Sequence, residues 1–406
     1  MEKVLVLKKI LIVTEYFYPE EFKINEVAQE FSKKGYYVDI LTNNPTYPHG
    51  EVFENYKNKL FSKEIFQGMT VYRVKTITGY KTNVTKKIIK YLTFMILGSL
   101  VSLVIGKKYD YVFGFAGAAL TGMLPAIILR QLYKKPVTLW IQDIWPDSVS
   151  AFGFKETKFL EFLLNNFVSY IYKYSSNFAI SSKGFEKKVL KFANNSKEIL
   201  YAPNWADYLD KNLKTFSFSK EKKVHFTFAG NIGAVQNLDN IIKAFATIDE
   251  EYLNKVQLNI IGDGSHLNNL REFVKKKKYN NIIFWGMKPR EEIDRYLQAS
   301  DFLIVSLINE EIFSLTVPAK TQTYISTGKP IIAIINGEVA NIVEKNNLGL
   351  VCSPNNIDKI KSTFITAINK SDKEKKMYLK NSAILTKTIF SKNKIINDLL
   401  KLLKRG

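Results

Sequence analysis

The sequence predicts an α/β protein with two doubly wound domains. At 406 residues the chain is long for a single hydrophobic core. In both halves, short apolar runs typical of buried parallel strands alternate with helix-like segments. A polar, lysine-rich stretch without strong periodicity separates the halves, and a new strand follows it.

Residues 313–335 predict a loop, a short helix, a sharp stop and a buried strand. Thr316 is a plausible helix cap, and Gly328 suits the position just past the helix. The apolar run 331–335 is too short for a helix and fits a parallel strand covered on both faces. Lys320 then lies at a helix N-terminus, at the carboxyl edge of a sheet, where an anion such as a phosphate can bind. The alternative is an ordinary strand–helix–strand unit in which Lys320 is solvated.

Composition limits the class of protein. The hydrophobic content of 46% fits a folded chain, and 59 basic against 38 acidic residues give a net charge of +21. That charge favours anionic partners, and the absence of a nucleic-acid motif leaves a membrane surface or a nucleotide as the expected partner. The single cysteine, Cys352, allows no internal disulfide and fits a reducing cytoplasm. The N-terminus is too short and too charged for a secretory signal.

The first half opens with a strand–helix–strand unit. The strand 10–14 is followed by a helix that runs to Gly35 and by the strand 37–41. No G-x-G-x-x-G follows the first strand, which argues against an ordinary NAD domain. His49, in the loop 43–50, is either catalytic or a bystander. Further strands are expected at 109–115, 137–142, 175–181 and 199–205.

An apolar segment at residues 86–108 carries lysines at both ends. Its uncharged run, 91–106, is shorter than the roughly 20 residues needed to span a bilayer. We expect a helix in the membrane interface, favoured by the basic flanks; the alternative is a helix packed in the core.

Asp143 directly follows the predicted strand 137–142. Parallel sheets present functional groups at the carboxyl ends of their strands. Asp143 is therefore a candidate site residue, although it and Asp147 could instead cap the next turn.

The second half begins with the strand 224–229 and a small-residue loop that starts at Gly230. Further glycine turns follow later strands, and small residues at helix N-termini let backbone N–H groups approach an anion. We expect a first domain at 1–205, a linker at 206–223, a second domain at 224–385, and a C-terminal segment at 386–406 whose helix could pack back on the first domain.

Six segments keep the order found in one enzyme family: TEYFYPEEFKINEVAQEF, LWIQDIWPDS, YAPNWAD, FAGNIGAVQNLDNII, GDG and VPAKTQTYISTGKPI. Together they resemble family 4 glycosyltransferases of the GT-B fold, over about residue 10 to beyond residue 350. They look like the N-acetyl-fucosamine transferase-like branch, which builds O-antigen or capsule. The resemblance implies two Rossmann-like domains that face a central cleft.

The resemblance also implies a reaction and its partners. A retaining enzyme would move a sugar from a UDP-sugar to a glycan on a polyprenyl-diphosphate carrier, at the inner face of the cell membrane. It would use no cofactor and bind no nucleic acid. Asp143 and Lys320 are the expected catalytic residues. The expected donor-binding residues are Gly230, Asn231, Gly233, Gln236, Gly262, Gly286, Ser314, Thr316 and Thr323. The expected residues on the acceptor or phosphate side are Lys23, Asn25 and His49.

Several positions depart from the family pattern. Phe22 and Lys23 stand where many relatives carry a Gly-Gly pair, and Asn231 and Gln236 stand where an Arg and a Lys hold the diphosphate. The usual E-x7-E glutamates are replaced by Leu315 and Thr323. Phosphate neutralisation is therefore expected mainly from Lys320 and helix N-termini, with Lys23 as a further candidate.

No D-x-D occurs in the chain, so a metal held by paired carboxylates is not expected. Two other functions stay open: a sugar-nucleotide epimerase, or a non-catalytic nucleotide-sugar binder. An epimerase would need no acceptor, and a binder would neither transfer nor hydrolyse the sugar.

Overall fold

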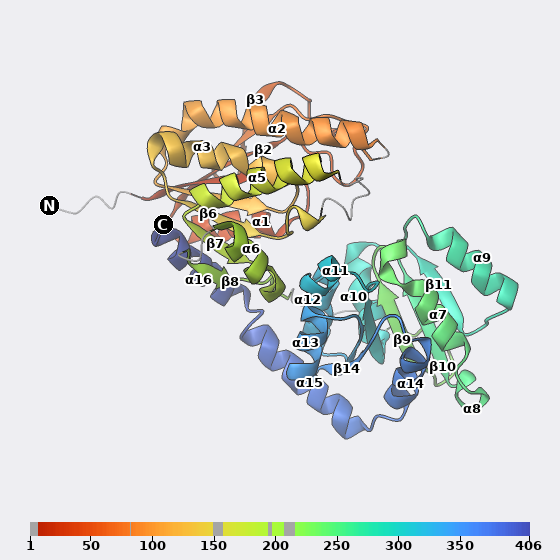
Figure 1. The fold of residues 1–406 in the computed structure, drawn as a ribbon. Helices are drawn as coiled ribbons and strands as arrows, with labels where there is room; N and C mark the ends of the chain where they lie inside the picture. The colour runs from red at the N-terminus through yellow and green to blue at the C-terminus, as the bar shows by residue number, and fades with distance from the viewer. Residues whose placement is uncertain (1–6, 82, 149–156, 194–196, 207–215) are drawn as a thin grey trace. The chain divides into compact units, whose positions relative to one another are not determined.

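The computed structural model describes residues 7–81, 83–148, 157–193, 197–206 and 216–406. It divides into two compact units, one made of residues 1–203 and 393–406 and the other of residues 204–392. Each unit is an α/β structure around its own sheet (Figure 1).

Unit 1 contains an eight-stranded sheet in the order β3-β4-β2-β1-β5-β6-β7-β8. All neighbouring strands pair in parallel except β3, which pairs antiparallel with β4. β1 is central, with Ile12 opposite Ile40 of β2 and opposite Phe113 of β5. The strands are β1 (Lys9–Thr14), β2 (Tyr37–Asn43), β3 (Phe61–Phe66), β4 (Met69–Val74), β5 (Tyr111–Ala116), β6 (Val137–Ile141), β7 (Asn177–Ile180) and β8 (Ile199–Tyr201).

Helices flank this sheet, and three of them, α2, α3 and α5, form one layer (Figure 1). The last helix, α16, returns to unit 1, where the Asn177 side chain donates a hydrogen bond to the carbonyl of Leu402 at 2.9 Å. The helices are α1 (Lys23–Lys33), α2 (Val84–Ile105), α3 (Leu124–Tyr133), α5 (Lys158–Tyr174), α6 (Glu186–Ala193) and α16 (Lys392–Lys404).

Unit 2 contains a six-stranded parallel sheet in the order β11-β10-β9-β12-β13-β14. Apolar side chains pack on both of its faces, which explains the continuous hydrophobic runs of its strands. The strands are β9 (Val224–Ala229), β10 (Val256–Ile261), β11 (Ile282–Gly286), β12 (Phe302–Ser306), β13 (Ile331–Ile334) and β14 (Gly349–Cys352). The helices are α7 (Leu238–Ala246), α8 (Glu250–Leu253), α9 (Leu267–Lys277), α10 (Arg290–Ala299), α11 (Glu311–Leu315), α12 (Ala319–Thr327), α13 (Glu338–Lys345), α14 (Ile357–Ile368) and α15 (Asp372–Lys387).

The stretch 313–335 follows the predicted order of helix, stop and strand, with one correction. Gly328 ends α12 in the left-handed conformation, at φ 73°, and β13 follows. Thr316 does not cap α12, because Pro318 holds that position without a side-chain hydrogen bond. Thr316 instead ends the short helix α11, where only a loop was predicted.

The predicted linker 206–223 lies partly outside the described residues, which omit 207–215. The described residues of this stretch are partly packed into a hydrophobic core. Ala206 and Phe218 are buried in the core of unit 2. The polar composition of the stretch gave no indication that these two residues are buried.

Candidate functional site

Glycine turns after β9, β10 and β11 meet at the carboxyl edge of the unit 2 sheet. The amide of Gly230 donates to the carbonyl of Ile261 at 3.0 Å, and the amide of Gly262 donates to the carbonyl of Gly286 at 2.9 Å. A Cβ on Gly262 would lie only 1.9 Å from the carbonyl oxygen of Gly230. Three predicted donor-binding glycines are therefore brought together, and at Gly262 no larger residue fits.

Lys320, in the first turn of α12, points into this group of turns. Its Nζ would lie 2.9 Å from a Cβ on Gly230, and it lies 3.7 Å from the centre of the Phe228 ring. Gly230 itself has φ 135°, a conformation that favours glycine. Because Gly230 has no side chain, the ammonium group of Lys320 can occupy the space next to it.

The Lys320 amine is buried and has no hydrogen-bond partner among the described residues. Burial lowers the pKa of Lys320 to about 7. A buried, unpaired ammonium is costly, and an anionic oxygen placed beside it would remove that cost. The amide groups of the first turn of α12 add donors and the positive end of the helix dipole.

The other predicted donor-binding side chains are turned back on their own segments. Gln236 accepts a hydrogen bond from the amide of Gly233 at 2.9 Å and so closes its own turn, while Asn231 stays exposed. The hydroxyls of Ser314, Thr316 and Thr323 donate to the carbonyls of Glu311, Phe313 and Ala319. These hydroxyl oxygens can still accept hydrogen bonds from a ligand. Among the proposed donor-site side chains, only that of Lys320 carries a charge, and this charge is buried without a hydrogen-bond partner in the described residues.

In unit 1, Asp143 lies two residues beyond the end of β6, at the carboxyl edge of the sheet. Its Oδ1 accepts a hydrogen bond from the amide of Ile144 at 3.0 Å, and burial raises the pKa of its carboxyl group. Asp143 also influences the pKa of Tyr91, a residue of α2, and thus lies within electrostatic range of that helix. The neighbouring candidate Asp147 forms an ion pair with Lys188 at 2.5 Å, which is a structural role.

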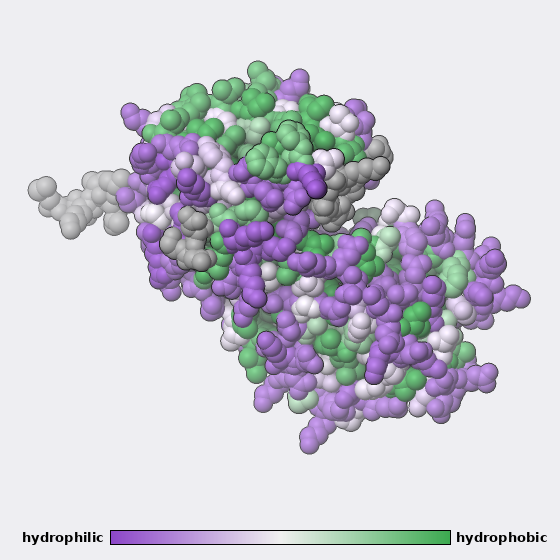
Figure 2. All heavy atoms as spheres, in the orientation of Figure 1, coloured by the Kyte–Doolittle hydropathy of each residue, from purple (hydrophilic) through white to green (hydrophobic). Residues whose placement is uncertain are grey.

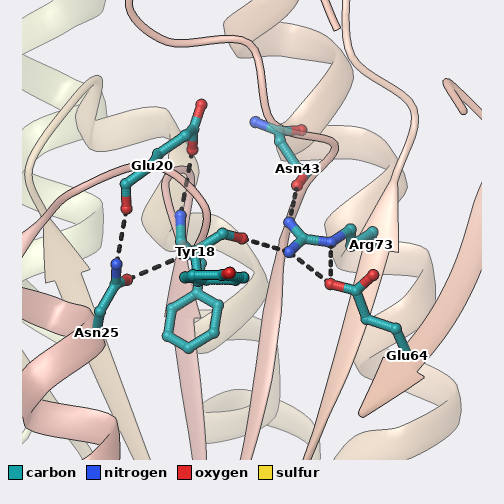
Figure 3. A network of polar contacts seen from close by, with 7 residues as sticks. Tyr18, Glu20, Asn25, Asn43, Glu64 and Arg73 are labelled. Atoms are coloured by element: carbon teal, nitrogen blue, oxygen red, sulfur yellow. Dashed lines mark hydrogen bonds and ion pairs between the residues drawn. The ribbon is translucent and has the colours of Figure 1, made fainter. Parts of the chain in front are cut away.

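The loop after β1 is held by a polar network (Figure 3). Asn25 accepts from the amide of Tyr18 at 3.1 Å and donates to the carbonyl of Glu20 at 2.7 Å. Arg73 of β4, which is 1% exposed, donates to the carbonyls of Tyr18 and Asn43 and pairs with Glu64. The predicted ligand-binding residue Asn25 is thus engaged in shaping its own loop.

The two remaining predicted residues of this side are placed apart from that network. Lys23, the first residue of α1, pairs with Glu26 at 3.4 Å. His49 is exposed, and its ring lies 6.4 Å from that of Phe53. Neither shows the buried, unpartnered geometry of Lys320.

Two buried charged residues in unit 1 were missed by the sequence analysis. Glu15 directly follows β1 and is 2% exposed, and neither of its carboxyl oxygens has a hydrogen-bond partner among the described residues. Lys90, taken from the sequence as part of a basic flank, is 1% exposed on the inner side of α2. The sequence contained one signal that could have identified Glu15 as a candidate site residue, namely its position immediately after a buried strand.

Helix α2 is apolar on the outside and partly polar on the inside, the reverse of an ordinary surface helix. Its buried residues are Lys90, Phe94, Gly98, Ser99 and Ser102. Its exposed large residues are Val84, Ile88, Ile89, Leu92, Ile96, Leu100 and Val104. Figure 2 shows this apolar surface over α2, and Phe159, Phe162 and Leu163 of α5 are also exposed.

By length and composition alone, the segment Val84–Lys108 could cross a membrane, and 28% of its most apolar window is buried. The helix is longer than the uncharged run 91–106 because it begins at Val84. Its basic flanks are weaker than predicted, since Lys90 is buried and Lys108 forms an ion pair with Asp39 at 2.9 Å.

Within the described part of the chain, no three His, Cys, Asp or Glu side chains cluster closely enough to hold a metal ion. The candidate site elements are thus a buried amine among glycine turns in unit 2 and a set of buried carboxyl groups in unit 1.

Comparison with known proteins gives a consistent result. Residues 210–384 match the family model "Glycosyl transferases group 1". The chain is 25% identical over 253 residues to the probable glycosyltransferase WbjE of Pseudomonas aeruginosa, covering 58% of this chain and 62% of WbjE. It is 22% identical over 323 residues to WcaI of Escherichia coli K12, a putative colanic acid biosynthesis glycosyl transferase, covering 73% of this chain and 76% of WcaI. The chain thus spans less than two thirds of WbjE.

Among solved structures, HepE of Anabaena (Alr3699), crystallised with UDP and glucose, superposes with a TM-score of 0.66. The alignment covers 98% of this chain and 100% of HepE, at 13% identity. At that identity the likeness establishes the fold.

Proposed function

The chain has the GT-B fold, with a group 1 glycosyltransferase domain in residues 210–384, and from this premise we propose that it is a retaining glycosyltransferase of bacterial surface-polysaccharide synthesis. The donor is a UDP-sugar, of an N-acetylated amino or deoxyamino sugar. The acceptor is a glycan on a polyprenyl-diphosphate carrier. Three facts support these assignments: the bound UDP of HepE, the colanic acid role in the name of WcaI, and the sequence resemblance to the N-acetyl-fucosamine transferase-like branch.

The observation that carries the proposal is the buried amine of Lys320, which lies among the glycine turns and has no hydrogen-bond partner in the described part of the chain. When a sugar leaves a diphosphate, negative charge grows on the leaving oxygens and positive charge grows on the sugar. A fixed ammonium and the amide groups of α12 would stabilise those oxygens most strongly in the transition state.

The remaining steps need little from the protein. In a front-face retaining reaction the leaving phosphate accepts the proton of the acceptor hydroxyl, so no protein base is required. Asp143 is proposed to orient the sugar, because it lies two residues beyond β6 at the carboxyl edge of the sheet. We also propose that no metal takes part, since the sequence contains no D-x-D motif that would hold a metal at the diphosphate.

A donor screen tests the proposal. The purified protein is incubated with a panel of UDP-sugars, and mass spectrometry follows their consumption. Hydrolysis of one donor without acceptor, at a rate that falls strongly in Lys320→Met, is the expected result. Conversion of one UDP-sugar into an isomer would indicate an epimerase, and binding of UDP without consumption would indicate a binder.

We further propose that α2 holds unit 1 on the inner face of the cell membrane. The outward face of α2 is apolar, and Phe159 and Phe162 of α5 extend this exposed apolar surface. Membrane attachment through this surface would bring the protein to an acceptor that is itself held in the membrane by its lipid. Lys86 and Lys107 are exposed at the two ends of the segment, and each basic residue near an anionic leaflet contributes about 1 kcal/mol.

Liposome sedimentation tests this attachment. Serine at Leu92, Ile96, Leu100 and Val104 should release the protein from anionic vesicles and leave UDP binding unchanged. Phe94 is kept, because it is fully buried and its loss would unfold the unit. Retention of the folded variant on vesicles to the wild-type extent would refute the role of α2.

A further inference from the structure

The environment of Glu15 contrasts with that of another buried carboxylate in the same unit. Asp39 of β2 accepts hydrogen bonds from the amide of Thr70 at 3.1 Å, from Lys108 at 2.9 Å and from the Tyr109 hydroxyl at 2.6 Å. Glu15 has none, although it is equally enclosed. A buried carboxyl group without donors is destabilising, so its presence at the end of β1 calls for an occupant that supplies them.

A glycine leaves room for the Glu15 carboxyl group. A Cβ on Gly122, in the short 3-10 helix η2 (Leu120–Met123), would lie 2.8 Å from the Glu15 Oε1 atom. Any larger residue at this position would press on the carboxyl group. The loop after β5 thus approaches the end of β1 closely without offering a hydrogen bond to it.

Lys90 approaches the same place from α2. Its Nζ donates to the Tyr16 hydroxyl at 3.2 Å, and it lies 4.5 Å from the ring centres of both Tyr16 and Tyr80. That is its only hydrogen bond to a described residue, although an ammonium has three donors. Lys90 and Glu15 influence each other electrostatically, yet no ion pair within 4.0 Å joins them. Burial raises the pKa of Glu15 to about 8 and lowers the pKa of Lys90.

This arrangement selects a particular kind of ligand group. A cation would be repelled by Lys90, and a phosphate would be repelled by Glu15 whenever that group is ionised. A hydroxyl suits both residues in either state of Glu15, because its hydrogen can be donated to a carboxyl oxygen while its own oxygen accepts from the ammonium.

We propose that Glu15 and Lys90 bind one hydroxyl group of the acceptor glycan between them. The proposal rests on the proposed function, and it adds a specificity-determining pair on the acceptor side. Lys90 belongs to the helix whose other face is proposed to contact lipid, so the same element would present the membrane surface and line the acceptor site.

Aromatic rings form the outer border of this pair. Tyr16 stacks on Phe22 at 4.7 Å, and Tyr47, which is 46% exposed, lies 5.5 Å from Tyr16 and 5.3 Å from Phe22. Amphipathic rings of this kind suit the apolar face of a sugar. Because Glu15 and Lys90 are 2% and 1% exposed, the acceptor reaches them only when neighbouring side chains move.

The charged and titratable groups around the pair come from several elements. Glu20, in the loop after β1, is held by the amides of Thr46 and Tyr47 at 2.8 and 2.7 Å. Lys87 on α2 acts on Lys90 at longer range, and Asp143 acts on the neighbouring Tyr91. Since these groups titrate too, the test relies on substitutions and not on a pH profile.

A double-substitution cycle tests the proposal. Glu15→Met and Lys90→Met are compared singly and together, with transfer to a soluble acceptor analogue and donor hydrolysis measured separately. Each single change should raise the acceptor KM about ten- to a hundredfold, as expected for losing a hydrogen bond to a charged group. The double variant should be no worse than either single variant, because one bridged hydroxyl is lost in all three. Donor hydrolysis should stay at the wild-type rate.

Thermal melting separates this role from a structural one. Removing both unsatisfied charges should leave the melting temperature of the double variant at or above that of the wild type. In the control Asp39→Asn, melting should fall while the acceptor KM stays unchanged. A folded double variant with the wild-type acceptor KM would overturn the proposal and would mean that the pair holds only a buried water. Absence of donor hydrolysis in the wild type would instead refute the proposed function.

Discussion

Replacing Lys320 by methionine should separate stability from activity. Methionine keeps most of the apolar stem and removes the buried charge. The variant should fold at least as well as the wild type and should lose most of its turnover. A residue that serves only the fold would show the opposite result.

The size of the stability effect follows from the pKa of Lys320. Its fall from 10.5 to about 7 sets an upper bound of roughly 5 kcal/mol, because one pKa unit corresponds to about 1.4 kcal/mol. Local relaxation and loss of the Phe228 contact reduce this, and we expect a gain of about 1–3 kcal/mol. The folded amine binds its proton more weakly than the unfolded amine, so wild-type stability falls as pH decreases from 10.5 towards 7. The gain in Lys320→Met should therefore be largest below pH 7 and fade towards pH 10.

The catalytic effect can be measured independently of stability. Losing a charge-assisted contact to phosphate costs about 1.5–3 kcal/mol, or roughly ten- to over a hundredfold in rate. Isothermal titration in two buffers of different ionisation enthalpy should also show that UDP binding at about pH 8.5 takes up about one proton, as the phosphate restores the charge on Lys320. Lys320→Met should show no uptake.

Lys329, beyond the other end of α12, is the matched control. Burial lowers the pKa of Lys329 as well, but the nearby Asp301 counteracts that shift. Lys329→Met should keep near-normal turnover and proton uptake. Near-normal turnover in Lys320→Met, with Lys329→Met inactive, would show that the wrong lysine has been assigned to the diphosphate.

Four further outcomes are expected. Transfer should survive EDTA, and a rate that collapses with chelator and returns with magnesium would contradict metal independence. Asp143→Asn should lower the transfer rate at saturating donor by about tenfold or more; an unchanged rate would make Asp143 structural. Gly262→Ala should destabilise unit 2 by more than about 2 kcal/mol, because its Cβ would collide with the Gly230 carbonyl; unfolding in urea measures this. Arg73→Met should cost about 3–5 kcal/mol in the same assay, because it leaves Glu64 and two carbonyl groups without their donor.

Local sequence patterns predicted most of the fold, and the GT-B prediction is confirmed. The β3–β4 hairpin was missed, although Gln67 and Gly68 form a two-residue turn with φ of 49° and 82° between alternating strands. That signal is typical of a tight hairpin, which joins antiparallel strands and so differs from the strand–helix–strand pattern of the rest of the sheet. Helix α11 was missed because five residues carry too little periodicity to be seen.

The candidate site was predictable only in part. Lys320 and the glycine turns follow from their position after buried strands. The surroundings that bury the Lys320 amine are formed by Phe228 and Gly230, which lie about ninety residues earlier in the sequence. Similarly, the position of Lys90 just before the uncharged run 91–106 is typical of a solvated lysine at the end of an apolar segment. Only the packing of α2 turns its side chain towards Glu15. Burial and pairing arise from tertiary contacts, which no local pattern contains.

The most direct test is transfer to a lipid-linked acceptor. The protein, a UDP-sugar and a short polyprenyl-diphosphate-linked glycan are combined, and the lipid product is weighed by mass spectrometry. A gain of one sugar residue with release of UDP, abolished in Lys320→Met and preserved in Lys329→Met, is the predicted result. An acceptor of unchanged mass, across a donor panel that includes N-acetylated amino and deoxyamino sugars, would contradict the assignment as a glycosyltransferase.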